Sequence, residues 1–269
     1  MKGYTNIPYA KQTADLMHGS EVFGLNFEDK DIWFWVRVLH FESRYWSIDQ
    51  LLKLTESKNI LEFSSGYSLR GLDLCAKDEQ VHYIDTDLLE IVSTKQQMID
   101  HLQLNHEAKG RYELLPLNAL DPKAFEEVIG RFDPRPITFV NEGLLMYLND
   151  EEKKQLCSLI HKVLKQSGGC WITADIYVKR SPEMAGKMPA SKSEIDFMEQ
   201  HKLEENKFES FEAARAFFLA QGFEFVQEAA HNYEGMSSLP NMIKMLPEEA
   251  RNSNQKWPKI QATWMLRAK

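Results

Sequence analysis

Polar side chains that could bind a nucleoside recur where short apolar runs of this sequence end. The residues at these positions are Glu62, Asp87, Asn118 and Glu142. A carboxylate can accept hydrogen bonds from a ribose diol, which is the role that we expect for Asp87, and each such bond contributes roughly 0.5–1.5 kcal/mol. A single acid of this kind could equally be an ordinary helix N-cap. Four polar strand ends together favour a binding site.

A glycine turn follows the first of these runs. Asn59–Phe63 is too short for a helix and too apolar for a loop, and Ser64, Ser65 and Gly66 come next. Gly66 has no Cβ, so its backbone can approach a ligand closely, and the helix predicted behind it offers free N–H groups at its start. A parallel strand at residues 81–84 would complete the crevice in which doubly wound sheets bind nucleoside cofactors.

Strand and helix patterns alternate along the chain, which predicts an α/β fold with a mostly parallel sheet and helices on both faces. Seven strands are expected, at residues 59–63, 81–84, 113–117, 136–140, 170–174, 223–226 and 262–266, the last two as an antiparallel pair. Helices are expected at residues 10–17, 31–41, 43–54, 91–102, 123–129, 150–167 and 211–220. Arg70, just inside a further helix, could brace Glu62 or be solvated.

We expect one domain over residues 1–269, because the chain length and its 43% hydrophobic content suit a single large α/β unit. Residues 1–55 are expected to form an N-terminal helical cap and residues 56–175 the cofactor-binding core. Residues 176–210 are polar, rich in Met and Lys and weakly periodic, which is typical of a lid insertion. Residues 211–269 complete the sheet.

Composition excludes several classes of function. The net charge of -8 argues against non-specific nucleic-acid binding, which needs a basic surface. No apolar run approaches the roughly 18–20 residues of a membrane span, and residues 1–10 lack the apolar centre of a signal peptide. Cys75, Cys157 and Cys170 lie far apart and show no metal-ligand spacing. We therefore expect reduced thiols, no metal and a cytoplasmic location; the oligomeric state is left open.

The turn discriminates between two cofactor classes. Dinucleotide enzymes use G-x-G-x-x-G to admit a pyrophosphate, whereas this turn has one glycine, Gly66, between Ser65 and Tyr67. An acidic rim suits a cationic, phosphate-free nucleoside better, and that points to S-adenosylmethionine. An NAD(P)-type oxidoreductase remains the rival class, and a protein that binds the cofactor without turnover is a further alternative.

At this stage the sequence resembles the leucine carboxyl methyltransferase family, which includes polyketide-type O-methyltransferases. Phe139–Leu148, F-V-N-E-G-L-L-M-Y-L, is similar to the family's E-G-L-L-x-Y-L block, and residues 60–70 and 83–88 are similar to its first two strand blocks. The combined blocks cover roughly residues 40–175. The resemblance implies a class I, Rossmann-like methyltransferase fold of seven strands with a helical lid, and S-adenosylmethionine as cofactor. A tRNA-modifying relative is disfavoured by the negative charge.

The resemblance also implies roles for individual residues at the methionine end of the cofactor. Arg44 is similar to the arginine that binds the methionine carboxylate, although it could also be a surface ion pair. Glu142 is similar to the residue near the methionine amine, and Gly66 to the close-approach glycine. Lys11 could match a basic residue of the N-terminal segment that contacts the cofactor. We also expect Glu62 to bind the cofactor.

At the adenosine end, the resemblance implies that Asp87, followed by Leu88, binds the ribose. Asn118 and Ala119 fall where the adenine-contacting pair lies, but the family often has Asp at the position of Asn118, which leaves a hydrogen bond possible without the charge. For the acceptor we name His40 and Tyr147 as substrate-binding candidates, with residues 32–41 as an apolar wall. A carboxylate acceptor needs no base, whereas an alcohol or phenol does. The predicted activity is O-methylation of a small molecule or carboxylate, with the catalytic residue unassigned.

Overall fold

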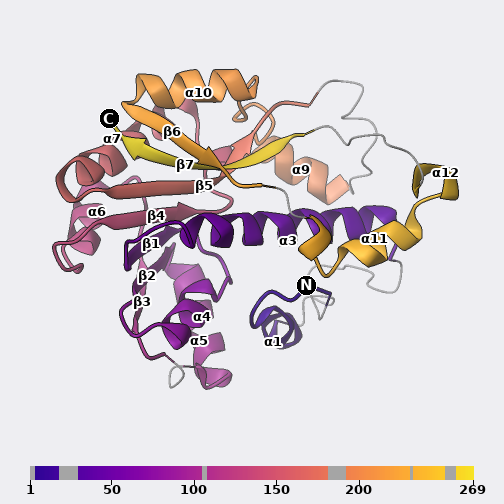
Figure 1. The fold of residues 1–269 in the computed structure, drawn as a ribbon, viewed down its shortest axis with the longest axis horizontal. Helices are drawn as coiled ribbons and strands as arrows, with labels where there is room; N and C mark the ends of the chain where they lie inside the picture. The colour runs from indigo at the N-terminus through magenta and orange to yellow at the C-terminus, as the bar shows by residue number, and fades with distance from the viewer. Residues whose placement is uncertain (1–3, 18–29, 105–107, 181–191, 231–232, 252–258) are drawn as a thin grey trace.

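The computed structural model describes residues 4–17, 30–104, 108–180, 192–230, 233–251 and 259–269 (Figure 1). Its centre is a seven-stranded sheet in the order β3-β2-β1-β4-β5-β7-β6. The strands are β1 (Asn59–Phe63), β2 (His82–Asp87), β3 (Arg111–Pro116), β4 (Ile137–Asn141), β5 (Gly169–Tyr177), β6 (Phe223–Glu228) and β7 (Gln261–Ala268). Neighbouring strands from β3 to β5 pair in parallel, and β7 pairs antiparallel with both β5 and β6. The predicted sheet and its final antiparallel pair are confirmed.

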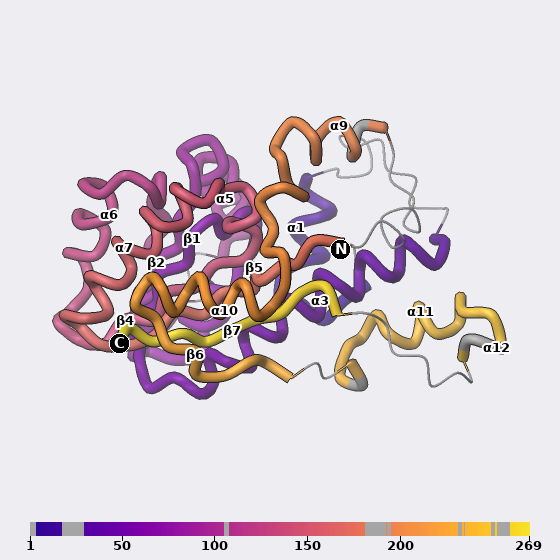
Figure 2. The backbone as a smooth tube through the Cα atoms, turned by 90° about the horizontal axis from the view of Figure 1, so that it is seen from above, coloured from indigo at the N-terminus to yellow at the C-terminus, as the bar shows by residue number. Residues whose placement is uncertain are grey.

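Helices cover both faces of the sheet (Figures 1 and 2). One face packs against α6 (Pro122–Ile129), α7 (Asp150–Ser167) and α10 (Phe211–Ala220). The other packs against α3 (Ile32–Leu52), α4 (Arg70–Lys77) and α5 (Leu89–His101). Further helices are α1 (Ala10–Leu16), α9 (Lys192–Gln200), α11 (Leu239–Met245) and α12 (Glu248–Arg251), with 3-10 turns at η2 (Leu145–Tyr147) and η3 (Tyr233–Gly235).

Alternating side chains of the central strands divide the core between the two faces. In β1, Leu61 and Phe63 pack beneath α6 and α7, whereas Ile60 packs beneath α3 and α4. Glu62 shares the face of Ile60, because side chains two residues apart in a strand point the same way. The strand register therefore places a carboxylate on the α3 and α4 side at the carboxyl edge of the sheet.

Local signals fix several helix ends as expected. Asn149 accepts hydrogen bonds from the backbone of Glu151 and Glu152, and the Glu152 side chain accepts one from Asn149, which completes the predicted capping box of α7. Asp121 caps α6, in which Pro122 takes the first helical position.

The prediction of two helices at residues 31–41 and 43–54 is wrong, because α3 is one helix from Ile32 to Leu52 with Asp31 as its N-cap. Glu42 and Ser43 interrupt the apolar run without breaking the backbone. The fully buried Glu42 carboxylate instead accepts hydrogen bonds from the backbone N–H and hydroxyl groups of Ser237 and Ser238. These bonds secure the segment that leads into α11, which packs on α3 and which the sequence pattern did not predict.

The predicted lid at residues 176–210 is only partly described. Its first residues extend β5 to Tyr177, Val178 bridges to Phe208, and α9 lies between them in sequence; residues 181–191 of the predicted lid lie outside the described residues. The carboxyl ends of the parallel strands face the side of the molecule that carries α1, α9 and α11 (Figures 1 and 2). Within the described ranges, no helix is both long and apolar enough to cross a membrane.

Candidate cofactor site

The turn after β1 is held open beside empty space. Gly66 has φ +54°, and a Cβ built on it would meet no atom within 4 Å. Its N–H donates to Asp87 Oδ2 at 2.8 Å, and the N–H of Ser65 donates to the carbonyl oxygen of Thr86 at 3.1 Å. The backbone of the turn is thus tied to the end of β2 while its outer side stays open to a ligand.

A buried lysine supports the same turn from beneath. Lys95 of α5 donates to Ser65 Oγ at 3.0 Å and to Asp85 Oδ2 at 2.6 Å, and both charged side chains are fully buried. Tyr112 of β3 donates to the same carboxylate oxygen at 2.7 Å. This network joins α5, β2 and β3 to the turn and fixes its position against the sheet.

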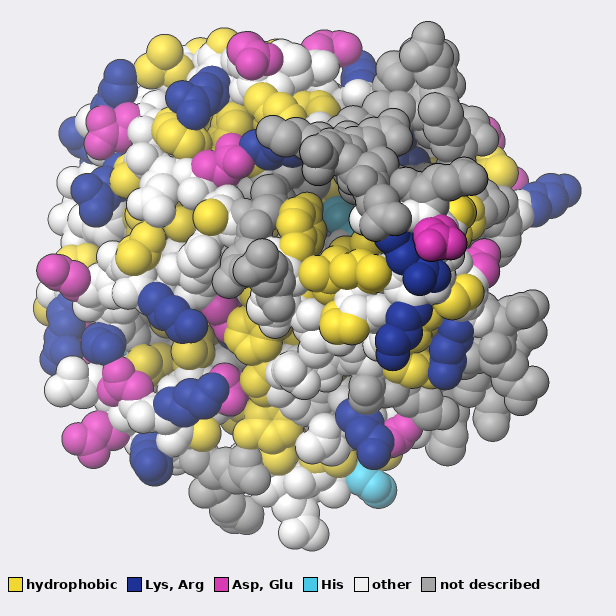
Figure 3. All heavy atoms as spheres, turned by 45° about the vertical axis from the view of Figure 1, so that its right-hand side comes forward, with side chains coloured by type: hydrophobic (Ala, Val, Ile, Leu, Met, Phe, Trp, Pro, Cys, Tyr) yellow, Lys and Arg dark blue, Asp and Glu magenta, His cyan; other side chains and the backbone are white. Residues whose placement is uncertain are grey.

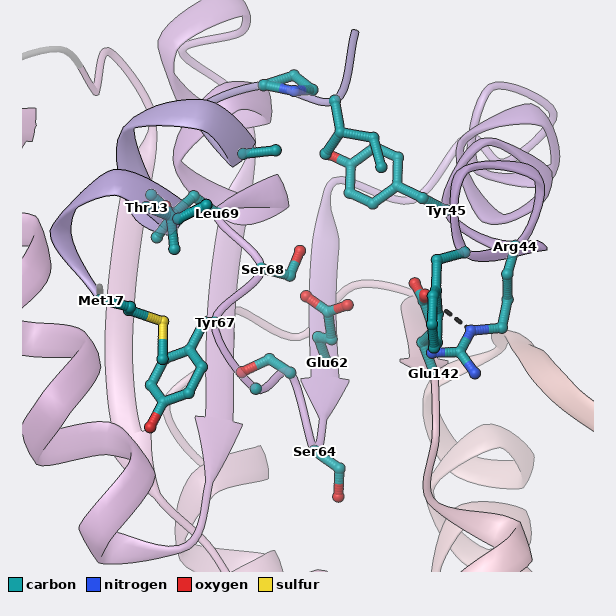
Figure 4. A pocket seen from close by; sticks show the side chains of 17 residues that line it. Thr13, Met17, Arg44, Tyr45, Glu62, Ser64, Tyr67, Ser68, Leu69 and Glu142 are labelled. Carbon is teal, nitrogen blue, oxygen red and sulfur yellow. Dashed lines mark hydrogen bonds and ion pairs between the residues drawn. The ribbon is translucent and has the colours of Figure 1, made fainter. Parts of the chain in front are cut away.

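A cavity of about 360 Å³ lies at the carboxyl ends of β1 and β4, between α1 and α3 (Figure 4). Its volume falls within the roughly 300–1,000 Å³ of small-molecule sites. The structure brings four of the predicted cofactor-binding residues together in its wall: Arg44, Glu62, Gly66 and Glu142.

Arg70 organises the polar floor of this cavity. Its Nε donates to Asp49 of α3 at 2.8 Å, its Nη1 to Glu62 at 2.6 Å, and its Nη2 to Glu142 at 3.1 Å and to the carbonyl oxygen of Tyr45 at 3.2 Å. The guanidinium also lies 4.1 Å from the centre of the Tyr45 ring. Of the two roles left open for Arg70, the structure shows the bracing one: the side chain is 1% exposed and holds carboxylates of three separate elements.

The cavity wall has a surplus of negative charge. The charged residues that line the cavity are Arg44, Glu62 and Glu142, and behind them Arg70 pairs with Asp49, so full ionisation of these carboxylates leaves a net charge of -1. Burial raises the pKa of Glu62 to about 7, against the opposing charge of Arg70. Burial also acts against ionisation of Glu142, but Arg44 and Arg70 outweigh it and hold the Glu142 pKa below its usual range. The site therefore favours a cationic ligand.

Four predicted residues lie beside the cavity rather than in the wall that the described residues form. Asp87 Oδ1 accepts the N–H of Leu88 at 2.7 Å, and the Leu88 side chain is 59% exposed. Asn118 accepts the N–H of Leu120 at 3.0 Å, and Ala119 is buried in the core with α6. Because β2 and β3 run parallel to β1, these residues stand at the same edge of the sheet. Their cofactor contacts stay predictions.

Lys11 lies on α1 but faces away from the cavity. Ala10, Thr13 and Ala14 of α1 line the cavity, as does Met17 at the C-cap, and these residues lie on one face of the helix. The Lys11 side chain is exposed on another face. The structure thus brings the helix to the site without bringing its lysine there.

The acceptor candidates lie near Arg44. Arg44 donates from Nε to Glu142 at 2.8 Å and from Nη1 to the Tyr177 hydroxyl at 3.0 Å, and His40 Nε2 lies 2.8 Å from the same hydroxyl. Tyr147 is 41% exposed, with its ring 6.4 Å from that of Phe197 in α9. Figure 3, in which the right-hand side of Figure 1 is turned forward, shows hydrophobic side chains gathered near the middle of the visible face.

Sequence reasoning missed three residues of this region. Tyr177 escaped because β5 was expected to end at residue 174, although the strand continues to Tyr177. Tyr45 follows Arg44 directly, but nothing in the sequence indicated where its hydroxyl points. Thr13 had as its only signal the small neighbours Ala10 and Ala14 at helical spacing, a pattern too common to single it out.

Comparison with known proteins yields similarity in fold but not in sequence: no protein-family model and no curated protein matches the chain. Magnesium protoporphyrin IX methyltransferase from Synechocystis PCC 6803, solved with bound SAH, superposes with a TM-score of 0.51 at 10% identity over 97% of this chain and 96% of its own.

Mitomycin 7-O-methyltransferase superposes with a TM-score of 0.47 at 9% identity over 78% of this chain, which spans only 49% of that enzyme's length. OxaC in complex with SAH and oxaline gives 0.48 at 11% identity, over 84% of this chain and 47% of its own. At such low sequence identities the structural similarity establishes only the fold. We base the fold assignment on the Synechocystis enzyme, whose length this chain matches. The chain has the α/β, Rossmann-like fold of class I methyltransferases.

Proposed function

We propose that this protein is an S-adenosylmethionine-dependent methyltransferase that methylates an oxygen atom of a small molecule. The observation that carries the proposal is the cavity with surplus negative charge beside the single-glycine turn at Gly66. A sulfonium nucleoside is cationic and carries no phosphate, so it suits such a wall. A pyrophosphate would meet Glu62 and Glu142 instead, which disfavours the NAD(P) alternative.

The residues present fit this cofactor. The open space at Gly66 is a cradle that any side chain would partly fill, and the surplus carboxylate charge matches the cation. Arg44, Glu62, Gly66 and Glu142 would hold the methionine end, with Asp87, Leu88, Asn118 and Ala119 at the adenosine end. A cofactor of this kind supplies a methyl group that is already activated. The protein then mainly has to position the acceptor, which can supply several kcal/mol, with an upper range of about 7–11 kcal/mol.

The acceptor side favours a hydroxyl group. The Tyr177 hydroxyl accepts from Arg44 and shares a hydrogen bond with His40, so this pair offers a route for the proton that an alcohol or phenol must lose. A carboxylate would not need it. The exposed Tyr147 and Phe197 rings would contact the body of an aromatic acceptor. We therefore rank phenols first and carboxylic acids second.

Finer assignments belong to the same proposal. Phe139–Leu148 and the first two strand blocks support membership of the leucine carboxyl methyltransferase family. The described cysteines are free and buried, which fits a reducing, cytoplasmic environment. A small-molecule acceptor and no nucleic-acid partner fit the net charge of -8.

Titration calorimetry with S-adenosylhomocysteine and with NAD, followed by turnover with S-adenosylmethionine and panels of phenols and carboxylic acids, tests the proposal. We expect S-adenosylhomocysteine to bind and NAD not to, and a phenol to be methylated faster than any acid. Binding of NAD alone would replace the cofactor assignment. Cofactor binding with no product from either panel would favour the protein without turnover.

A further inference from the structure

A buried carboxylate in β5 is bonded to the loop that leads from β4 into the site. Asp175 is only 2% exposed, and it is not among the described residues that line the cavity. Its carboxylate accepts four hydrogen bonds, all from the end of β4 and the loop that follows. Oδ1 accepts from the N–H of Gly143 at 2.6 Å, and Oδ2 accepts from the side-chain amide of Asn141 at 2.6 Å and from the N–H groups of Leu144 at 2.5 Å and Leu145 at 3.0 Å. Three consecutive backbone N–H groups therefore point at one carboxylate.

These bonds hold the loop in a sharply turned conformation. In the parallel pairing of β4 with β5, Asn141 lies opposite Thr173, so Asp175 stands beside the loop that begins where β4 ends. Gly143 has φ +87°, a backbone conformation that residues with a Cβ adopt rarely. An ionised carboxylate offers acceptors only, and its acceptors here serve three N–H groups of the turn. Asp175 thus fixes the backbone at residues 143–145.

The residue that this loop carries into the cavity is Glu142, directly before Gly143. Its carboxylate accepts from Arg44 Nε at 2.8 Å and from Arg70 Nη2 at 3.1 Å (Figure 4). The two arginines belong to different helices, α3 and α4, so one carboxylate can meet both only when its backbone is held in place. In the proposed function this carboxylate also faces the ammonium group of the cofactor.

We infer that Asp175 is a positioning residue of the cofactor site. By binding the N–H groups of residues 143–145, it sets the Glu142 carboxylate where that group meets the ammonium of the amino-acid end. Asp175 does not touch the ligand and acts through Glu142. The inference rests on the proposed function, and it extends the machinery of the site to the carboxyl end of β5.

The test compares S-adenosylhomocysteine with 5′-methylthioadenosine, which keeps the thioether nucleoside and lacks the amino-acid end. Asp175→Asn keeps the shape of the side chain but replaces one acceptor oxygen by an NH2 group, which must face an N–H donor of the loop. By calorimetry, we expect this variant to bind S-adenosylhomocysteine about tenfold more weakly, because the charged contact of Glu142 is displaced. Binding of 5′-methylthioadenosine should change less than twofold.

A double-mutant cycle with Glu142→Gln tests the route of the effect. If Asp175 acts through Glu142, the Asp175→Asn substitution should weaken binding of S-adenosylhomocysteine less than twofold in the Glu142→Gln background. Losses that add in the double variant would show that Asp175 acts by another route, and would overturn the inference.

Glu42→Gln is the matched control. Glu42 is also a buried carboxylate that accepts four hydrogen bonds, but its donors are Ser237 and Ser238, outside the cofactor loop. This variant should bind S-adenosylhomocysteine within twofold of the wild type. A loss as large as that of Asp175→Asn would show a general effect of disturbing a buried carboxylate and would overturn the inference. An equal loss of both ligands in Asp175→Asn would do the same.

Hydrogen exchange in the wild-type protein decides the question if Asp175→Asn does not fold. S-adenosylhomocysteine should slow exchange at the amides of residues 143–145, because its ammonium group holds Glu142 and with it the loop. 5′-Methylthioadenosine should slow it much less. Equal protection by the two ligands, or none by either bound ligand, would overturn the inference and leave the function intact. Failure of the wild-type protein to bind either ligand would instead refute the proposed function.

Discussion

Arg70 and Glu62 show how much of the site could be deduced from single residues. Glu62, Gly66 and Glu142 were predictable because each follows an apolar run at the edge of a parallel sheet, where side-chain type and position suffice. The full role of Arg70 was not, because its partners Asp49 and Glu142 are distant in sequence. The donors to Asp175 likewise come from the end of β4 and the loop after it, and no local sequence pattern encodes that arrangement.

Ionisation of Glu62 predicts how cofactor binding depends on pH. In the unliganded cavity burial raises the Glu62 pKa to about 7, although Arg70 and Lys95 oppose the shift, Asp85 adds to it, and Tyr83 donates to the carboxylate. Below that pH the group is mostly neutral, and a cationic ligand must displace its proton. Affinity for S-adenosylmethionine should therefore rise as the pH increases, by about tenfold between pH 6 and pH 8 when binding requires the carboxylate.

The measurement is calorimetric titration at pH 6, 7 and 8 in two buffers with different ionisation enthalpies, which also counts released protons. Glu62→Gln, which keeps an amide oxygen for Arg70, should bind more weakly at pH 8 and lose most of the pH dependence. A variant with the same slope as the wild type would show that another group titrates, such as the ligand's own amine.

At the scale of elements, α3 connects the core to the site. One side of the helix packs Ile48 and Leu51 on the sheet. The same helix carries Arg44 and Tyr45 to the cavity and Asp49 to Arg70 behind it. Buried parallel strands were predicted well because they appear as short apolar runs between turns. The continuity of α3 was not, because Glu42 is buried as part of a cap for a distant segment that the local pattern does not contain.

Glu42 provides a prediction at this scale. Glu42→Ala should lower the free energy of unfolding by roughly 1–3 kcal/mol, because it leaves the buried polar groups of Ser237 and Ser238 without acceptors. Hydrogen exchange should accelerate most at residues 239–245, with little change in β1 and β4. The free energy of unfolding of Glu42→Gln, which retains one acceptor oxygen, should lie between those of the wild type and Glu42→Ala. Uniform acceleration across the sheet would instead show that this cap supports the whole fold.

At the scale of the molecule, the site depends on segments that meet only after folding. Its walls come from α1, α3, the turn after β1 and the loop after β4, whereas the clusters beneath the two sheet faces draw on α3 to α10 and include no buried residue of α1 among those described. The sheet could therefore be predicted from local patterns, but the covering position of α1 could not. A ligand that contacts both α1 and the turn should couple this helix to the sheet.

Trypsin reports that coupling, because Lys11 is an exposed cleavage site within α1. Cleavage requires local opening of the helix. If the bound ligand contacts α1, this contact must break before the helix can open. Saturating S-adenosylhomocysteine should therefore slow cleavage after Lys11 several-fold. Lys123 in α6, whose side chain is 89% exposed on the opposite face of the sheet, is the internal control and should be cut at an unchanged rate. Mass spectrometry of the timed digest distinguishes the two sites. Equal protection at both would indicate global stabilisation, and no protection at Lys11 in the presence of bound ligand would show that α1 does not hold it.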